Sequence, residues 1–389
     1  MVPYLRAANV KDGFLDLSDV KQMNFAPAER RVFSLRPGDV LVTEGSGSLG
    51  SVGASAVWRG EIEGPVCFQN TLLRMRPREG VTDGRFLEWW ARSAFGSGVF
   101  ASVATGANIY HISAERVRAL PIEVPSMEEQ RRIADFLDTQ TARIDRMTDL
   151  QRAALDRVAE RDVAALDLGI DALYEQVGFL PLRRFVVGVD QGASPQCDAV
   201  PADKDEWGVL KVSALRPGHF ESSANKRLPD DMVPDRRSEV REGDLLITRA
   251  NTPQLVGSTA VVPRVRGKLL LSDKIFRVRL APDMDAHYVA AVARGSRVRA
   301  ACAAASNGAS QSMANLRFEE IKDWPIPRAS PAQQRAFVQQ MERSREAVGQ
   351  IRTKIDRQLA LLSERRQSLI TAAVTGQLDV TTAGRAAAA

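Results

Sequence analysis

The sequence has few of the residues that build metal sites and disulfide frameworks. Its 389 residues include three histidines and three cysteines, and the cysteines lie far apart at Cys67, Cys197 and Cys302. They are odd in number and form no CxxC pair, which argues against both a disulfide framework and a zinc site. We therefore expect no bound metal ion.

Long hydrophobic runs are equally scarce. No apolar run approaches the ~18 residues of a membrane-spanning helix. The start of the chain, "MVPYLRAANVKDG", lacks the basic and then apolar pattern of a secretion signal. With 44% hydrophobic and 26% charged residues, these absences predict a cytoplasmic globular protein of two or three domains. The net charge of +5 weakly favours an anionic partner.

Signatures of catalysis on nucleotides are missing as well. There is no G-x-x-x-x-G-K-S/T phosphate loop and no Asn/Asp-Pro-Pro-aromatic motif of an adenine methyltransferase. A nuclease would need clustered carboxylates with a lysine. The nearest approach is the loop "LPDDMVPDRR", whose prolines favour a solvated turn. We therefore expect no catalytic residues and no cofactor bound by this chain.

The segment "EGSGSLG" at 44–50 is the stretch that most suggests a cofactor. It contains G-x-G-x-x-G directly after the strand-like "DVLVT". A dinucleotide loop must be followed by a helix. Here "SVGASAVW" follows, which is small, β-branched and broken by Gly53, so it is more typical of a second strand. We interpret "EGSGSLG" as a flexible loop between two strands.

An internal repeat organises the chain. Four segments recur in the same order at nearly one offset, which indicates two tandem copies of one unit. The pairs are "LRPGDVLVT" (35–43) with "VREGDLLIT" (240–248), "SVGASAV" (51–57) with "LVGSTAV" (255–261), "TLLRMR" (71–76) with "KIFRVR" (274–279), and "LPIEVPSMEEQRRI" (120–133) with "WPIPRASPAQQRAF" (324–337). At the place of "EGSGSLG" the second copy has "RANTPQL", so the glycine pattern is not part of the shared framework.

Each copy has a β-rich front followed by a long helix. Short alternating runs between Gly, Pro and Asp signals predict strands in the front. A proline-marked break follows, and Ser126 and Ser330 are suited to cap the helices that start there. Apolar residues then recur at the a and d spacing of a heptad. The predicted seam comprises Ile133, Leu137, Ile144, Met147, Phe337, Met341, Val348, Ile351, Ile355 and Leu362.

Two interpretations of the seams remain open, because each helix could pack on its own domain or on the other helix. A helix of ~40 residues is ~60 Å long, longer than one small β domain can cover, which favours pairing. We predict an α+β fold of two tandem β-rich domains, each followed by a long helix, with the helices paired as an antiparallel coiled coil. The predicted boundaries are 1–125 and 169–329 for the β-rich domains, 126–168 and 330–378 for the helices, and 379–389 for a disordered tail.

The repeated motifs together resemble a known family. They are the "GD-V/L-L-V/I-T" turn and strand, the "P-I" strand end, and the "EEQ" and "AQQ" starts of the long helices, each used twice. The closing "SLITAAVTGQLDV" at 368–380 is also similar to the usual end of that family. Over nearly the whole chain to about residue 380, the sequence resembles the specificity (S) subunit of Type I restriction–modification systems.

The resemblance implies a function without catalysis. Each β-rich domain would be a target recognition domain that reads one half of a bipartite sequence in double-stranded DNA. The paired helices would set the spacing between the half-sites and dock two methyltransferase subunits, with restriction subunits as further partners. The methyltransferase subunits would carry S-adenosylmethionine and methylate adenines after flipping them out of the duplex.

The two copies differ at their starts. Residues 181–205 precede "WGVLKVSALRPG" in the second copy, whereas the matching "VPYLRAANVKDG" begins at residue 2. The first recognition domain therefore looks clipped. Either the true start lies upstream, or a missing strand is supplied from elsewhere.

Residues that read bases should lie where the copies diverge, because framework positions match while half-sites differ. The divergent loops are "EGSGSLG" against "RANTPQL", and "ATGANIYHIS" (104–113) against "SNGASQSMANL" (306–316). Arginine suits guanine, and asparagine and glutamine suit adenine. The DNA-binding candidates are Ser46, Ser48, Asn108, Tyr110, His111, Arg249, Asn251, Gln254, Asn307 and Gln311. For each of them, tolerant loop surface is the alternative.

The role of four arginines and the class of the whole chain each allow more than one interpretation. The arginines alternate along strands, and they either contact phosphate or lie at solvated edges; they are Arg74, Arg76, Arg277 and Arg279.

The whole chain could instead be a two-headed coiled-coil scaffold that binds protein partners. It could also be an S-like subunit of a different phage-defence or methylation system.

Overall fold

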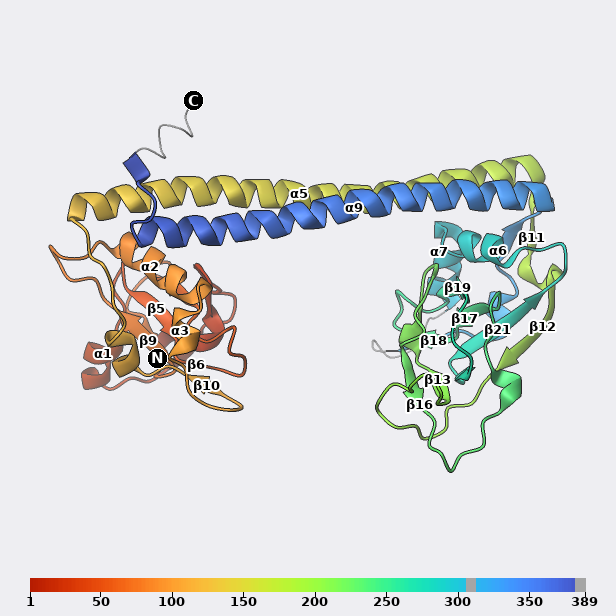
Figure 1. The fold of residues 1–389 in the computed structure, drawn as a ribbon, viewed down its shortest axis with the longest axis horizontal. Helices are drawn as coiled ribbons and strands as arrows, with labels where there is room; N and C mark the ends of the chain where they lie inside the picture. The colour runs from red at the N-terminus through yellow and green to blue at the C-terminus, as the bar shows by residue number, and fades with distance from the viewer. Residues whose placement is uncertain (306–312, 382–389) are drawn as a thin grey trace. The chain divides into compact units, whose positions relative to one another are not determined.

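The computed structural model describes residues 1–305 and 313–381, and the chain divides into two units (Figure 1). Unit 1 comprises Met1–Ala153 with Ile355–Ala389, and unit 2 comprises Ala154–Lys354. Each unit contains one β-rich part and a portion of both long helices, α5 (Met127–Val177) and α9 (Pro331–Val374). Among the described residues, none of the helices combines the length and apolarity needed to span a membrane.

The β-rich part of unit 1 is built on two three-stranded sheets. One has the antiparallel order β7-β5-β9, and the other has the order β4-β1-β8, in which β8 runs parallel to β1. Two-stranded pairs β2–β3 and β6–β10 complete it. The elements are β1 (Val2–Leu5), η1 (Ala7–Asn9), β2 (Val10–Lys11), β3 (Phe14–Leu15), β4 (Lys21–Met23), α1 (Pro27–Phe33), β5 (Val40–Thr43), β6 (Gly45–Ser46), β7 (Ser55–Val57), β8 (Cys67–Phe68), β9 (Leu72–Met75), α2 (Gly84–Gly96), α3 (Val99–Ser102), β10 (Tyr110–His111) and α4 (Ala114–Arg118).

Unit 2 repeats these sheets and adds strands to them. Its orders are β12-β21-β17-β19 and β16-β13-β20, with the pairs β14–β15, β18–β22 and β11–β23. The elements are β11 (Phe179–Pro181), η2 (Leu182–Arg184), β12 (Val186–Gln191), β13 (Gly208–Leu210), η3 (Val212–Ala214), β14 (Leu215–Arg216), β15 (His219–Phe220), β16 (Asn225–Arg227), η4 (Arg236–Ser238), β17 (Leu245–Thr248), β18 (Ala250–Asn251), β19 (Thr259–Val261), β20 (Leu269–Leu270), β21 (Ile275–Leu280), α6 (Ala286–Val292), α7 (Ser296–Ala305), β22 (Ala314–Asn315), α8 (Phe318–Ile321) and β23 (Pro325–Pro327). The α+β class is therefore confirmed.

The added strands explain the difference between the starts of the two copies. In unit 2, β12 pairs with the outer edge of β21, and β11 pairs with β23. Within the described part of unit 1, β9 pairs with β5 alone and its outer edge has no strand beside it. The β-rich part of unit 1 thus has an open sheet edge at the place where that of unit 2 has β12.

The central strand of each unit is buried on both faces, which is why it reads as a continuous apolar run. In β5, Val40 and Val42 join one core with α2, while Leu41 joins the other core with Leu5 of β1. In β17, Leu245 and Ile247 face one core, and Leu246 faces the other. Successive side chains of a strand point to opposite faces of the sheet, so each of these strands contributes to both cores.

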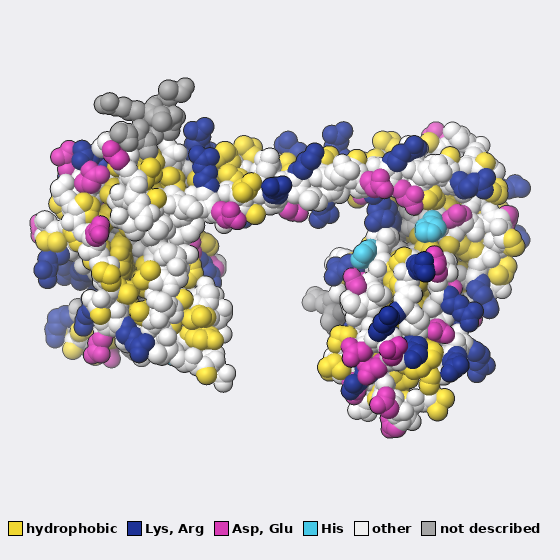
Figure 2. Space-filling view, viewed as in Figure 1, with side chains coloured by type: hydrophobic (Ala, Val, Ile, Leu, Met, Phe, Trp, Pro, Cys, Tyr) yellow, Lys and Arg dark blue, Asp and Glu magenta, His cyan; other side chains and the backbone are white. Residues whose placement is uncertain are grey.

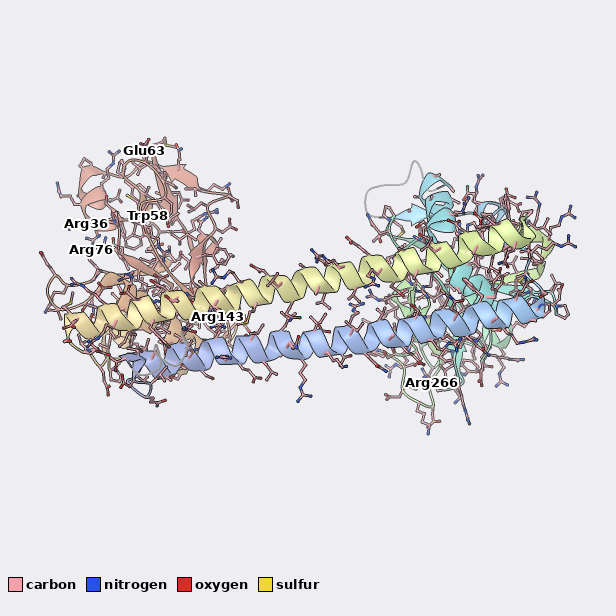
Figure 3. All side chains as sticks on the ribbon, turned by 90° about the horizontal axis from the view of Figure 1, so that it is seen from above. Arg36, Trp58, Glu63, Arg76, Arg143 and Arg266 are labelled. Atoms are coloured by element: carbon pink, nitrogen blue, oxygen red, sulfur yellow. The ribbon has the colours of Figure 1, made fainter. Side chains whose placement is uncertain are left out.

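The repeated "GD" turn binds an arginine of the neighbouring strand. Asp39 accepts a hydrogen bond from the Arg36 backbone at 2.8 Å and two from the Arg76 guanidinium at 2.6 Å. These hydrogen bonds raise the pKa of Arg76. Arg36 and Arg76 are labelled in unit 1 in Figure 3. In unit 2, Asp244 accepts from the Arg241 backbone at 2.9 Å and from Arg277 at 3.2 Å.

Three of the four alternating arginines therefore have structural partners. Arg74 donates to the carbonyls of Val32 and Ser34, at 2.9 and 3.0 Å, and Arg76 and Arg277 bind the turn aspartates. These contacts show a structural role for the three arginines, and their contact with phosphate stays a prediction. Arg279 remains exposed and lies 3.4 Å from Asp190.

A buried glutamine joins each long helix to the short helix of the β-rich part in the same unit. Gln130 accepts a hydrogen bond from the Asp83 backbone at 2.7 Å and donates to the carbonyls of Val81 and Pro125. Gln334 makes the same set in unit 2, accepting from the Asp285 backbone at 2.8 Å. The two aspartates in turn cap α2 and α6. This is the structural role of the glutamine in "EEQ" and "AQQ".

The first long helix was predicted too short. It continues past residue 168 to Val177, because Gly169 does not break it. A Cβ at Gly169 would lie 3.1 Å from the Phe337 ring, so the glycine lets the two helices approach closely. The β-rich part of unit 2 accordingly begins beyond Val177, not at residue 169.

The C-terminal boundary also differs from the prediction. The second helix ends at Val374, before the predicted end at residue 378. The tail was predicted to be disordered from residue 379, yet Val380 is buried in a core of unit 1 with Ile133, Leu137 and Ile370. Residues 382–389 lie outside the described residues.

The predicted seam residues contact both the other helix and the domain beneath it. In unit 1, Ile133 and Leu137 pack with Ile370 of α9 and with Phe86 and Trp89 of α2. In unit 2, the ring of Phe337 lies 5.7 Å from that of Tyr288 in α6 and also contacts Gly169 of α5. The two interpretations of the seam are therefore not exclusive.

Most of the seam is at least partly covered. Ile144 and Ile355 are buried, and Met147, Val348 and Leu362 are partly buried. Ile351 is 43% exposed, so its place in the seam stays a prediction. The seam also contains residues beyond the predicted end of the first helix, namely Ile170 and Leu173.

Candidate nucleic-acid interface

The structure brings the two divergent loops of each copy together. In unit 1, β6 pairs with β10, so that Ser46 lies opposite Tyr110. In unit 2, β18 pairs with β22, so that Asn251 lies opposite Ala314. We call the segments 44–53 and 249–257 the reader loops.

The base of each reader loop is held by the same hydrogen bonds. The Gly53 amide donates to the Thr43 carbonyl, and the Gly257 amide donates to the Thr248 carbonyl, both at 3.0 Å. Each threonine hydroxyl donates back into its loop, at 3.2 Å to Ser51 and 3.1 Å to Leu255. The framework of the repeat therefore closes both loops in the same way.

Glu44 and Arg249 occupy equivalent places at the start of these loops. The Glu44 amide donates to Thr71 at 3.0 Å, and its carbonyl accepts from Ile112 at 2.9 Å. The Arg249 amide donates to Lys274 at 2.8 Å, and its carbonyl accepts from Leu316 at 2.8 Å. The backbones thus share their partners while the side chains carry opposite charges. This is the arrangement expected of a scaffold that presents different readers.

The unit 1 candidates form one surface. Ser48, Asn108 and His111 are exposed, whereas Ser46 and Tyr110 are half-buried. The Ser46 hydroxyl accepts a hydrogen bond from the Ser48 amide at 3.2 Å, so one of its hydrogen bonds is made within the loop. The His111 imidazole lies against Gly45, where a Cβ would come within 2.8 Å of the ring. Gly45 is thus required by this histidine, and the segment is a loop, as predicted.

Two apolar side chains at the same surface were missed from the sequence. Leu49 of the reader loop is 42% exposed, and Ile109, next to Tyr110, is 57% exposed. Apolar side chains of this kind contact the methyl group of thymine in DNA complexes. The signal was present, since each is a large hydrophobic residue in a stretch of small and polar ones.

The unit 2 candidates lie on the other reader loop. Arg249 is half-buried, with one guanidinium nitrogen 3.5 Å from the Asp273 carbonyl. The Asn251 side-chain oxygen accepts from the Thr252 amide at 2.8 Å, which leaves its NH₂ group to donate. Gln254 is exposed, and its carbonyl accepts from Arg299 of α7 at 2.9 Å. Asn307 and Gln311 lie outside the described residues.

A second group missed from the sequence lies beside Arg249. Lys211, Lys226 and Lys274 line a pocket of about 270 Å³ in unit 2. They stand on or beside three different strands and are spread over more than 60 residues, so no local motif connects them. Lys and Arg side chains are distributed over the surfaces of both units (Figure 2).

Comparisons with known proteins agree with this geometry. The family description "Type I restriction modification DNA specificity domain" matches residues 2–155. The specificity subunit of the Escherichia coli Type I restriction enzyme EcoKI is 24% identical over 97% of this chain and 82% of its own length. Residues 2–155 thus match a Type I specificity domain, and nearly the whole chain is similar to a Type I specificity subunit.

Two further Type I specificity subunits match over shorter stretches of the chain. The EcoEI subunit of Escherichia coli is 34% identical over 36% of this chain, which is 24% of its own length. The StySPI subunit of Salmonella potsdam is 30% identical over 37% of this chain, which is 30% of its own length. The chain therefore matches less than a third of either of these two relatives.

Solved structures share the fold. A chain from a study of complex assembly and conformational transition of the type I R-M system superposes with a TM-score of 0.70 at 17% identity, covering 97% of this chain and 92% of that one. The HsdS subunit from Thermoanaerobacter tengcongensis gives a TM-score of 0.52 at 16% identity, covering 97% and 91%. Both comparisons show a shared fold over nearly the whole chain.

Proposed function

We propose that this chain is the non-catalytic DNA specificity subunit of a Type I restriction–modification complex. Its two recognition domains each read one half of a bipartite DNA target. The observation that carries this proposal is the pair of reader loops, which have the same closing hydrogen bonds and different side chains at their tips. A shared scaffold with divergent polar loops suits the recognition of two different half-sites on similar DNA surfaces.

We further propose that α5 and α9 pair as an antiparallel coiled coil that sets the spacing of the half-sites. Supporting this, the early residues Ile133 and Leu137 of α5 share a core with the late residues Ile370 and Val374 of α9 in unit 1. Asp145 and Arg366 form an ion pair at 3.3 Å in the same unit. Both helices continue from one unit into the other.

The partners we propose are double-stranded DNA, two methyltransferase subunits that bring S-adenosylmethionine, and restriction subunits, all in the cytoplasm. Exposed apolar side chains on the helices support protein docking there, because two strongly exposed leucines line one groove. Leu150 and Leu361 are 69% and 53% exposed and line this groove with Met147 and Leu362.

Leu150→Asp should weaken co-elution of the chain with the methyltransferase without lowering the melting temperature of the chain. Co-elution equal to that of the parent chain would exclude this groove.

Selection from randomised DNA tests the recognition function. The chain, purified with the methyltransferase encoded beside it, is incubated with a pool of random duplexes, and bound duplexes are sequenced. We expect two separate short elements with a fixed gap. Absence of enrichment by the intact complex, or a single continuous element, would contradict two-domain reading and favour a scaffold role.

Arg249→Ala tests one reader directly. Loss of a bidentate contact to guanine should cost about 1–3 kcal/mol of discrimination and relax one position in one half of the target. The half read by unit 1 should stay unchanged. Arg279→Ala is the control, because Arg279 is an exposed arginine of the same unit, remote in sequence from the reader loops. Altered preference in both halves would rule out base reading by Arg249.

A further inference from the structure

The lysine pocket beside Arg249 has the charge of an anion site. Lys211 follows β13, Lys226 lies in β16, and Lys274 directly precedes β21. No aspartate or glutamate is among the described residues that line it. Burial raises the pKa of the lining Cys197 thiol, although Lys226 acts in the opposite direction, so the thiol adds no negative charge at neutral pH.

The three lysines and the buried serine of the pocket lack partners among the described residues, whereas the lining Ser194 hydroxyl donates to the Asp273 carboxylate. Over residues 1–305 and 313–381, none of the three ammonium groups has a carboxylate within ion-pair distance. Ser272 also lines the pocket and is 4% exposed, yet its hydroxyl has no hydrogen-bond partner in the part of the chain described. A buried hydroxyl without a partner is unfavourable unless a ligand or water supplies one.

Unit 1 shows what these lysines would need for a purely structural role. Tyr4 in unit 1 and Val209 in unit 2 hold the same place in the repeat. Lys21 lies opposite Tyr4 and Lys226 lies opposite Val209, so the two lysines are equivalent. Arg6 stands two residues beyond Tyr4, as Lys211 stands two beyond Val209. In unit 1, Asp19 binds both cations, at 2.9 Å to Arg6 and 2.7 Å to Lys21.

Unit 2 lacks this acid. The residue two before Lys226, equivalent to Asp19, is Ala224. The third lysine, Lys274, is equivalent to Thr71, because both carbonyls accept the amide at the start of a reader loop. Unit 2 thus has one more cation at this place and lacks the acid that binds both cations in unit 1.

We infer that the lysine pocket binds a phosphate group of the DNA backbone beside the bases read by the loop 249–257. The inference rests on the proposed function. Lys274 is hydrogen-bonded through its carbonyl to the Arg249 amide at 2.8 Å, so pocket and reader loop share a strand end. Ammonium groups and a hydroxyl are the donors that proteins use for backbone phosphates, and such contacts fix the register of the protein on the duplex.

Ala224→Asp tests the inference by giving unit 2 the acid of unit 1. Binding to the selected bipartite duplex should weaken about tenfold, and the slope of log affinity against log salt should fall by about one, as for one lost phosphate contact. Ala336→Asp is the control, because Ala336 is exposed on α9 of the same unit and its substitution changes the net charge equally. Equal affinities of the two variants would overturn the inference.

Ser272→Ala separates binding from folding. A merely structural hydroxyl without a partner should be removable with no loss of DNA affinity. We expect the melting temperature to stay the same or rise while DNA affinity falls several-fold, because a phosphate loses a donor. Unchanged affinity would count against the pocket.

Duplexes with one neutral methylphosphonate at each backbone position identify the ligand. One position in the half-site of unit 2 should weaken binding by the parent chain and leave Ala224→Asp unaffected. If inorganic phosphate binds the pocket but every such duplex binds the parent chain normally, the pocket takes a free anion and the DNA inference fails. If the parent chain shows no sequence-specific binding at all, the proposed function itself fails.

Discussion

Gly257→Ala should destabilise unit 2 by roughly 3 kcal/mol, the sum of a left-handed backbone penalty and overpacking. Gly257 has a φ of +73°, and a Cβ there would lie 2.6 Å from the Cys302 sulfur and 3.2 Å from Leu316. The same residue closes the reader loop through its amide. Loss of stability should therefore be accompanied by loss of recognition of one half-site. Urea unfolding of the parent chain and the variant measures the difference.

Gly243→Ala is the matched control for this prediction. Gly243 has a φ of +86°, yet no atom lies within 4 Å of the place that a Cβ would occupy. It should cost only the backbone penalty of roughly 1–2 kcal/mol. If both variants lose the same stability, the contact with Cys302 does not constrain the loop.

Gln334→Leu should lower the free energy of unfolding by about 3 kcal/mol, because three backbone groups lose their hydrogen-bond partner at about 1 kcal/mol each. Gln334 is 1% exposed and accepts from the Asp285 amide while donating to the carbonyls of Asp283 and Ala329, at 3.0 and 2.9 Å. Leucine has nearly the same volume, so the effect reports hydrogen bonding and not packing.

Gln339→Leu controls for the substitution itself. Gln339 lies on the same helix and is exposed, so Gln339→Leu should change the free energy of unfolding of the protein by less than about 0.5 kcal/mol. A loss at Gln334 no greater than at Gln339 would show that the glutamine does not join the helix to the recognition domain.

The repeat made much of the framework predictable from sequence. The "GD" turn, the buried strand after it and the start of each long helix occur twice, so two weak local signals support one another. The strand–loop–strand interpretation of "EGSGSLG" also came from the repeat, and the pairing of β5 with β7 confirms it.

Features that depend on distant side chains could not be predicted. Gly169 ended the first helix in the prediction because glycine is a weak helix former, and only the approach of Phe337 shows why it is tolerated. Val380 looked like part of a polar tail, and its burial depends on Ile133 and Ile370. The lysine pocket combines three separate strand ends. Comparison of Asp19 with Ala224 could have revealed it, but only once the strand register was known.

Mapping of N6-methyladenine across the genome of a host tests the central claim most directly. The chain is expressed together with the methyltransferase encoded beside it, and formation of the complex is verified by co-purification. The account predicts methylation at one bipartite motif with a fixed gap, and Arg249→Ala should change one half of that motif only. Unchanged genomic methylation in the presence of the intact complex would contradict it.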